Sequence, residues 1–304
     1  MIYTFTLNPA LDYYITLSQE IMQDEVNRGF NETYKAGGKG LNVSKVLSLL
    51  SIPSTAICLL GGFTGQYIQS CYQDNKYIHL GPIQVNGPNR INVKANHGRH
   101  AFVINGQGPR ADNNTKQALL DDVKHIQKDD YAIISGSMMT GLDSQFLIDL
   151  CTAIHQQNAK IVLDMELNDT ELLQKCHPFL IKPNLYELQK LMHNPDITKQ
   201  NAAAYAKQLH LENVLVSLGP DGALFVHKDD VYKMNQPDTV MVNKVGAGDA
   251  MLAAFIGKLA ENKSIEEALQ YAGAAGNATA SMIQDITLQD IQYYLQFISV
   301  TRII

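Results

Sequence analysis

The sequence lacks the features of several large protein classes. It has no excess of basic residues, because 24 Lys and Arg stand against 30 Asp and Glu and the net charge is −6 at pH 7. Nucleic-acid binding through phosphates needs positive charge and is therefore not expected. No apolar run is long enough to cross a bilayer, and the N-terminus has no basic signal-peptide segment. We expect a cytoplasmic protein with neither a nucleic-acid nor a membrane partner.

Missing motifs exclude further classes. The four cysteines, at positions 58, 71, 151 and 176, share no metal-type spacing and lie in or beside apolar segments, which favours buried free thiols. There is no G-x-x-x-x-G-K-[ST] loop, and the late G-x-G-x-x-M lacks the third glycine of a dinucleotide-binding loop. No repeat, low-complexity tract or Pro/Gly-rich linker divides the chain. We therefore expect a single domain over residues 1–304.

Short apolar runs rich in β-forming residues alternate with helical stretches along most of the chain. This alternation predicts an α/β fold with a mostly parallel sheet and helices on both faces. Ligands of such sheets bind beyond the carboxyl ends of the strands. Strands are predicted at 2–7, 56–60, 131–135, 160–164, 179–182 and 214–218, and helices at 145–157 and 201–210.

Two segments break this pattern. Residues 11–35 look strand-like and poor in helix, and residues 90–105 alternate around the turn-forming Asn96-His97-Gly98. Both predict antiparallel inserts on the α/β core. We expect inserts at about 11–36 and 85–107 to form a small sheet that acts as a lid.

A glycine loop late in the chain opens an apolar helix predicted at 250–260. It reads Val245-Gly246-Ala247-Gly248-Asp249. Free backbone N–H groups and the positive end of the helix dipole make such a turn an anion site, and Asp249 is placed to accept a proton. An anion site and a base in one turn suit phosphoryl transfer. The alternative is that the glycines only shape a turn and Asp249 caps the helix.

Three further segments have the same character. Ala36-Gly37-Gly38-Lys39-Gly40 precedes a helix predicted at 41–50 and predicts a second anion site. In Lys182-Pro183-Asn184-Leu185-Tyr186-Glu187, the side chains of Asn184 and Glu187 can hold Mg²⁺ through waters; the alternative is an Asn cap with Glu at the third helical position. Alone, the segment from Ser217 to Ala223 is only a hairpin turn.

Taken together, these motifs resemble the PfkB (ribokinase-like) family of sugar kinases over nearly the whole chain. GGKGLNVSKVL (37–47) and VGAGDAMLAAF (245–255) resemble the two family signatures, with KPNLYE and SLGPDGA between them. TLNPALDYYI (6–15), GGFTG (61–65), RINVK (90–94) and INGQGP (104–109) resemble the branch of 1-phosphofructokinases and tagatose-6-phosphate kinases. The resemblance implies a three-layer αβα sandwich with a small β-sheet lid.

The resemblance also implies an activity, with ATP and Mg²⁺ as cofactors. It is phosphorylation of a ketohexose monophosphate to the bisphosphate, with fructose 1-phosphate as the first candidate and tagatose 6-phosphate as the alternative. Asp249 is the implied base, with the backbone of Gly246, Ala247 and Gly248 around the phosphoryl group. The implied sugar-phosphate residues are Asp12, Arg28, Gly38, Lys39, Asn42, Arg90, Asn92 and Ser137. Those of the nucleotide side are Lys182, Asn184, Ser217, Gly219, Gly222 and Asn277, with Asn184 and Glu187 toward the metal.

Charge chemistry agrees with a substrate that already carries phosphate, because Arg28, Lys39 and Arg90 can bind it. The alternative of a nucleoside or vitamin kinase on the same fold is disfavoured, because those substrates carry no phosphate for these cations to bind. A sugar-phosphate sensor without catalysis is the other alternative, and the intact Asp249 disfavours it. In the phosphosugar kinases of this family the lid pairs with that of another subunit, so we expect a homodimer.

Three departures from the family pattern stand near the site. They are Met138-Met139, Ala250 and Lys244. Many ribokinase-like enzymes hold a monovalent cation beside the late glycine loop, where this chain has Asn243 and Lys244. One hypothesis is that the Lys244 ammonium supplies that positive field, so that activity depends little on K⁺. The alternative is that Lys244 points to solvent.

Overall fold

The computed structural model describes residues 1–304 except 99, 238–241, 243, 244, 283 and 304. Over the described residues the larger of two sheets has ten strands. They are β1 (Ile2–Thr6), β4 (Ser54–Leu60), β5 (Ile78–Gln84), β8 (Tyr131–Ser135), β9 (Lys160–Asp164), β10 (Leu180–Ile181), β11 (Asn213–Ser217), β12 (Ala223–His227), β13 (Asp230–Met234) and β14 (Val300–Arg302). Their order is β14-β13-β12-β11-β10-β9-β8-β1-β4-β5.

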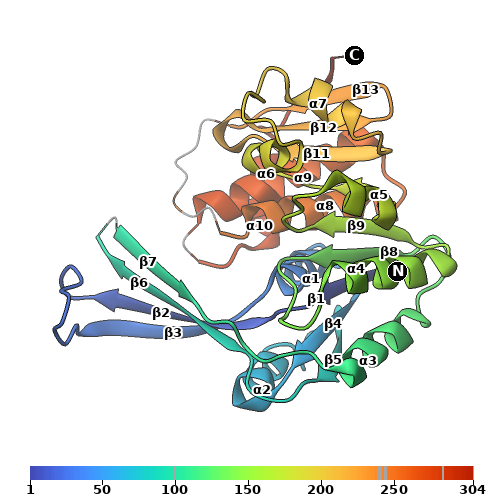
Figure 1. Cartoon of the computed structure of the whole chain (residues 1–304). Coiled ribbons are helices and arrows are strands. Elements are labelled where there is room, and N and C mark those ends of the chain that lie inside the picture. The colour runs from blue at the N-terminus through green and yellow to red at the C-terminus, as the bar shows by residue number, and fades with distance from the viewer. Residues whose placement is uncertain (99, 238–241, 243–244, 283, 304) are drawn as a thin grey trace.

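Helices cover both faces of this sheet (Figure 1). They are α1 (Lys39–Leu49), α2 (Gly62–Ser70), α3 (Asn113–Val123), α4 (Ser144–Gln156), α5 (Thr170–Cys176), α6 (Leu185–Leu191), α7 (Ala202–Gln208), α8 (Ala247–Ala260), α9 (Ile265–Ser281) and α10 (Leu288–Leu295). Buried side chains of α3 to α7 form one apolar cluster with the sheet, and those of α1, α8, α9 and α10 form another. The three-layer α/β prediction is confirmed.

The order in which successive strands join the sheet reverses at β1. From β1 the sheet continues through β4 to β5 on one side and, later in the sequence, from β8 through β9 and β10 to β11 on the other; all these pairs are parallel. In open α/β sheets, ligands bind beyond the carboxyl ends of the strands at such a switch point. Strand β10 is shorter than predicted because Pro183, which has no N–H to donate, follows it closely.

A four-stranded second sheet, counted over the described residues, projects from the core (Figure 1), and we call it the lid. Its strands are β2 (Ala10–Leu17), β3 (Gly29–Gly37), β6 (Arg90–His97) and β7 (His100–Asn105) in the order β3-β2-β6-β7. Each insert is an antiparallel pair, and the two inserts join through a parallel β2–β6 pairing. None of the helices in the described part of the chain has the length and apolarity to span a membrane.

Candidate active site

The late glycine loop leads into α8 through a left-handed residue. Gly246 is the N-cap, with φ 82°, a conformation that residues with a Cβ atom disfavour. The first-turn N–H groups of a helix have no intrahelical carbonyl partner, so this end of α8 is a place for an anion. A Cβ atom on Gly248 would lie 2.9 Å from Lys182 Nζ. The lack of a side chain at Gly248 thus lets an ammonium group approach the helix end.

Two lysines meet one buried aspartate beside this turn. Asp164, at the end of β9, is 1% exposed, and its Oδ1 lies 3.1 Å from Lys39 Nζ and 3.3 Å from Lys182 Nζ. Burial raises the pKa of Asp164, but the positive charges of Lys182 and Lys39 outweigh burial and hold this pKa below its usual value. Asp164 is therefore ionised and fixes both ammonium groups at the switch point.

Asp249 occupies the first turn of α8 and is also buried. Asn42 of α1 donates a 2.8 Å hydrogen bond from Nδ2 to Asp249 Oδ2. Burial first, and then the negative charge of Asp164, raise the pKa of Asp249 to about 6, against the opposing effects of Asn42, Lys182 and Lys39. A carboxylate with this pKa is ionised at pH 7 and still basic enough to take a proton from a hydroxyl group.

The base of the lid brings further predicted residues together. Asp12 accepts hydrogen bonds from Asn92 Nδ2 at 2.8 Å and from Lys94 Nζ at 2.6 Å. A Cβ atom on Gly37 would lie 2.8 Å from the Asp12 carboxyl carbon, so the carboxylate packs against the end of β3, next to Gly38, the N-cap of α1. The lid base therefore adjoins the helix end that carries Lys39.

Arg90 and Ser137 border the same region. The Arg90 guanidinium donates from Nε and Nη2 to the Asn8 carbonyl at 3.2 and 3.0 Å. Asn8 Nδ2 donates to Ser137 Oγ at 3.2 Å. Ser137 follows Gly136, whose added Cβ atom would lie 3.6 Å from Lys39 Cβ. Arg90, Ser137 and Lys39 thus border one region between the lid and the core.

Arg28 does not join this group within one chain. It precedes Gly29, which pairs with Leu17 at the outer end of the lid, whereas Asp12 pairs with Lys35 near the inner end. Five residues of strand separate Leu17 from Asp12, which is about 17 Å. The predicted cluster of Arg28, Lys39 and Arg90 is therefore only partly assembled by a single chain.

Residues predicted for the nucleotide side follow β10 and β11. Asn184 caps α6 by accepting from the Glu187 N–H at 2.9 Å, and Glu187 Oε2 accepts from the Asn184 N–H at 2.8 Å. This is the capping arrangement that the sequence left as an alternative, and it leaves Glu187 Oε1 for a further partner. Asn184 also pairs with Ser217 in a parallel bridge. Of the other residues predicted for this side, Gly219 is exposed, whereas Lys182 and Gly222 are buried.

One further predicted position does not contribute open surface to this region. Asn277 of α9 is buried, donates to the Gly273 carbonyl at 2.8 Å and accepts from Gln236. Its amide group is therefore engaged in hydrogen bonds within the protein. The expectations for Asn243 and Lys244 fall outside the described residues.

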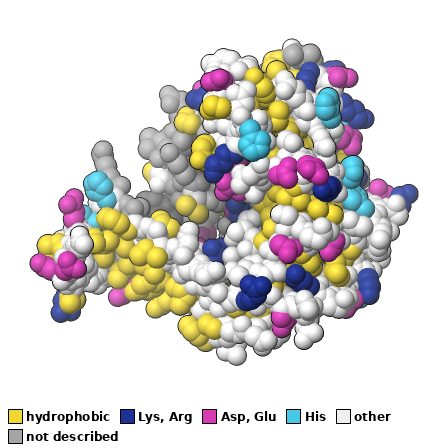
Figure 2. All heavy atoms as spheres, viewed as in Figure 1, with side chains coloured by type: hydrophobic (Ala, Val, Ile, Leu, Met, Phe, Trp, Pro, Cys, Tyr) yellow, Lys and Arg dark blue, Asp and Glu magenta, His cyan; other side chains and the backbone are white. Residues whose placement is uncertain are grey.

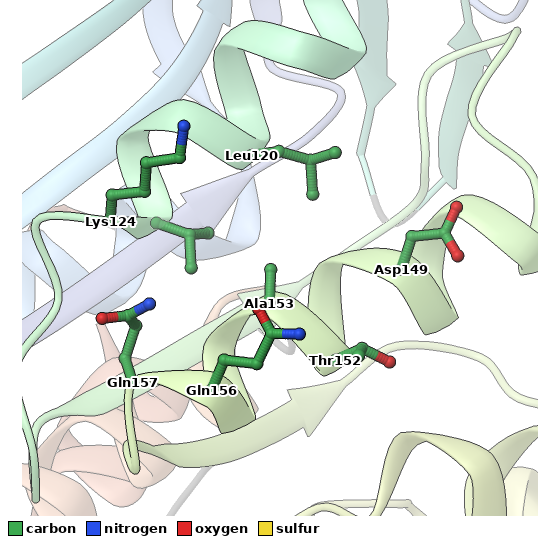
Figure 3. A pocket seen from close by; sticks show the side chains of 8 residues that line it. Leu120, Lys124, Asp149, Thr152, Ala153, Gln156 and Gln157 are labelled. Carbon is green, nitrogen blue, oxygen red and sulfur yellow. The ribbon is translucent and has the colours of Figure 1, made fainter.

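A surface depression lies away from these residues. It measures about 380 Å³ and lies between α3 and α4 (Figure 3). Its lining residues are Leu120, Val123, Lys124, Asp149, Thr152, Ala153, Gln156 and Gln157. None of these belongs to a glycine loop or to the charge cluster, so we place the functional site by its chemistry and not by cavity size.

Comparison with known proteins identifies the family of the chain. The family described as pfkB family carbohydrate kinase matches residues 6–290. A 1-phosphofructokinase of Bacillus subtilis is 34% identical over 306 residues, covering 100% of both chains. A D-tagatose-1-phosphate kinase of Bacillus licheniformis is 34% identical over 287 residues, covering 92% of both. The structure of phosphofructokinase-2 from Escherichia coli in complex with substrates and products superposes with a TM-score of 0.89 at 28% identity, covering 97% of this chain and 98% of the other.

The fold and the site define an α/β kinase that transfers a phosphoryl group to an alcohol. The chain belongs to the pfkB family of carbohydrate kinases. Sequence reasoning missed Asp164 as a site residue. Its signal is available, since it is the only acid of the strand KIVLD and ends that strand at the ligand-binding edge of the sheet.

Proposed function

We propose that the protein phosphorylates a ketohexose 1-phosphate at its C6 hydroxyl with ATP in the cytoplasm, with fructose 1-phosphate as first substrate and fructose 1,6-bisphosphate as product. The observation that carries the proposal is Asp249: a buried carboxylate with a pKa of about 6, at a helix N-terminus and close to two ammonium groups. Membership of the carbohydrate kinase family supports it.

In the proposed reaction the C6 hydroxyl of the sugar loses its proton to Asp249. The hydroxyl oxygen then forms a bond to the γ-phosphorus of ATP while the bond to the β,γ-bridging oxygen breaks, and ADP leaves. Asn42 holds the Asp249 carboxylate in place through its 2.8 Å hydrogen bond. Backbone N–H groups from Gly246 to Gly248 and the ammonium group of Lys182 stabilise the charge of the transferred phosphoryl group.

The residues present fit a hydrated Mg²⁺ ion better than a directly bound one. Within the described part of the chain, no three His, Cys, Asp or Glu side chains are grouped as direct metal ligands. The buried Asp164 Oδ2 has no hydrogen-bond partner among the described residues, and Glu187 Oε1 lies outside the capping arrangement. Both carboxylates influence Lys39 electrostatically. Glu187 and Asn184 would hold Mg²⁺ through waters, and the ion would neutralise phosphate charge.

The position of the existing phosphate separates the two substrate readings. A 1-phosphate presents C6 to Asp249, whereas tagatose 6-phosphate would present C1. Two of the relatives reported above are named for 1-phosphates, which favours the first reading. Lys39 and Arg90 border the proposed sugar site, and both suit a phosphate.

A direct test measures kcat/KM with ATP for four substrates: fructose 1-phosphate, tagatose 1-phosphate, fructose 6-phosphate and tagatose 6-phosphate. We expect at least tenfold preference for the 1-phosphates. Preference for tagatose 6-phosphate would select the alternative. Substrate binding without turnover of any of the four would support the sensor reading and refute catalysis.

We further propose that the protein is a homodimer through the lid. The lid carries exposed apolar side chains on one face, and Figure 2 shows hydrophobic side chains gathered there. Tyr34 is 53% exposed and Ile104 67%, and Ile91 and Phe102 are also exposed. Strand register places all four on one side of the sheet. A second copy would cover this face and could bring its own Arg28 to the sugar phosphate.

A further inference from the structure

Lys94 lies at the base of the lid, yet the proposed chemistry gives it no role. It is the last residue of the RINVK motif, on β6. Its side chain is 15% exposed, which is low for a lysine, and that of its partner Asp12 is 13% exposed. An ammonium group held this far from solvent needs specific partners, and those partners show what Lys94 does.

Strand register puts Lys94 on the side of the lid opposite the exposed apolar face. Asp12 pairs with Asn92, and Tyr14 with Lys94, across the parallel β2–β6 pairing. The Lys94 ammonium donates to Asp12 Oδ2 at 2.6 Å and to Tyr14 Oη at 2.9 Å. Asn92 Nδ2 donates to the other Asp12 oxygen at 2.8 Å. Lys94 and Asn92 thus fix both oxygens of Asp12.

The remaining hydrogen-bonding capacity at this place matches a hydroxyl group. An ammonium group has three N–H donors, and the described residues use two of them at Lys94; a carboxylate can accept about four hydrogen bonds, and two are made at Asp12. Asn92 Oδ1 is buried and has no hydrogen-bond partner among the described residues. The free acceptor sites on Asp12 and Asn92 lie next to one free N–H of Lys94, and a hydroxyl group, which both donates and accepts, can use both.

The same inventory argues against a phosphate at Lys94. A phosphate oxygen only accepts hydrogen bonds at neutral pH, and the negative charge of Asp12 lies 2.6 Å from the ammonium group. Repulsion from the carboxylate would oppose a second anion there. Arg90, whose guanidinium donates to the neutral Asn8 carbonyl, is better placed for the phosphate.

We propose that Lys94 is a positioning residue for sugar specificity: it fixes Asp12 and forms with it a donor–acceptor pair that binds a secondary hydroxyl of the sugar and selects its configuration. This proposal rests on the proposed function, because it takes the ligand to be a ketohexose phosphate. Fructose and tagatose 1-phosphates differ only in configuration at C4, so their ratio of kcat/KM measures the selection.

The test compares Lys94→Met with Lys35→Met as matched control. Lys35 lies opposite Asp12 on β3 and carries the same charge, but its ammonium pairs with Asp285. We expect Lys94→Met to lower kcat/KM for the preferred 1-phosphate by about 10- to 100-fold, as for a lost charge-assisted hydrogen bond, and to bring the epimer ratio at least fivefold closer to one. KM for ATP should change less than twofold, and Lys35→Met should leave all these values within twofold.

A double-mutant comparison tests whether Lys94 acts through Asp12. Adding Lys94→Met to Asp12→Asn should lower kcat/KM by less than threefold beyond Asp12→Asn alone. Lys94→Gln, which keeps a polar amide, replaces the Met variant if thermal melting shows that Met unfolds the lid. Equal losses for both epimers, full additivity with Asp12→Asn, or equal effects of Lys94→Met and Lys35→Met would each overturn the proposal. Absence of turnover by the wild type would instead refute the proposed function.

Discussion

The replacement Asp249→Asn should make the protein more stable at neutral pH while it removes activity. Asp249 is buried at the start of α8, and its folded-state pKa of about 6 lies above the ordinary value of 3.8. The ionised form is therefore less favourable in the folded protein than in the unfolded chain. Asn is neutral and nearly isosteric, and its side-chain oxygen can still accept from Asn42 Nδ2.

The sign and the size follow from proton linkage. Between pH 3.8 and 6 the folded state binds more protons at Asp249 than the unfolded state does, so this residue makes stability fall as pH rises through that window. Above pH 6 the ionised Asp249 lowers the free energy of unfolding by its full amount, about 3 kcal/mol for a pKa difference of about two. At pH 4.5 the same relation gives a smaller destabilisation by Asp249, about 1 kcal/mol.

Urea unfolding of the wild type and of Asp249→Asn at pH 7.5 and 4.5 measures this difference. We expect the Asn variant to exceed the wild type by up to about 3 kcal/mol at pH 7.5, and by clearly less at pH 4.5. Asp143→Asn is the control, because Asp143 caps α4 by accepting from the Phe146 N–H and Asn caps equally well. An Asp249→Asn variant that is less stable than the wild type, or an equal gain at both pH values, would refute the electrostatic account of Asp249.

Three other predictions concern substrate, metal and assembly. Arg90→Ala should raise KM for the sugar phosphate by about 10- to 100-fold, from the loss of a charge-assisted contact, and leave KM for ATP nearly unchanged; equal effects on both would place Arg90 elsewhere. Glu187→Gln should raise the Mg²⁺ concentration for half-maximal activity several-fold, and an unchanged Mg²⁺ titration would contradict its role. Ile104→Asp should shift sedimentation from dimer to monomer at micromolar concentration, and a wild type that is monomeric and fully active would refute the lid interface.

Local signals account for the parts of the structure that the sequence predicts. Runs such as Tyr131–Ser135 are mostly apolar and become central strands, because both faces of a parallel sheet are buried. Glycines before an apolar helix indicate a phosphate-binding turn by backbone geometry alone. At Asn184 and Glu187, however, the same three-residue spacing is compatible with a helix cap and with a pair of metal ligands. The structure shows the cap directly and leaves metal binding to the remaining oxygens.

Other features depend on contacts between distant segments. The parallel β2–β6 pairing joins residues about 80 positions apart, and only that pairing places Lys94 on Asp12. The distance of Arg28 from Arg90 likewise depends on the strand lengths and register of the folded lid. Asp164 acquires its importance from Lys39 and Lys182, which come from other elements. Local sequence can place Asp164 at the end of its strand, but it does not reveal which residues from other elements these side chains contact.

The most direct test of the central claim is the pH dependence of kcat/KM for fructose 1-phosphate in the wild type and in Asp249→Asn, with product identified as the 1,6-bisphosphate. We expect the wild-type value to rise to a plateau above pH 6, where Asp249 is ionised. The Asn variant should be about 10²- to 10⁴-fold slower and show no such rise. A variant within a few-fold of the wild type, or one with the same acid limb, would contradict the assignment of Asp249 as the base.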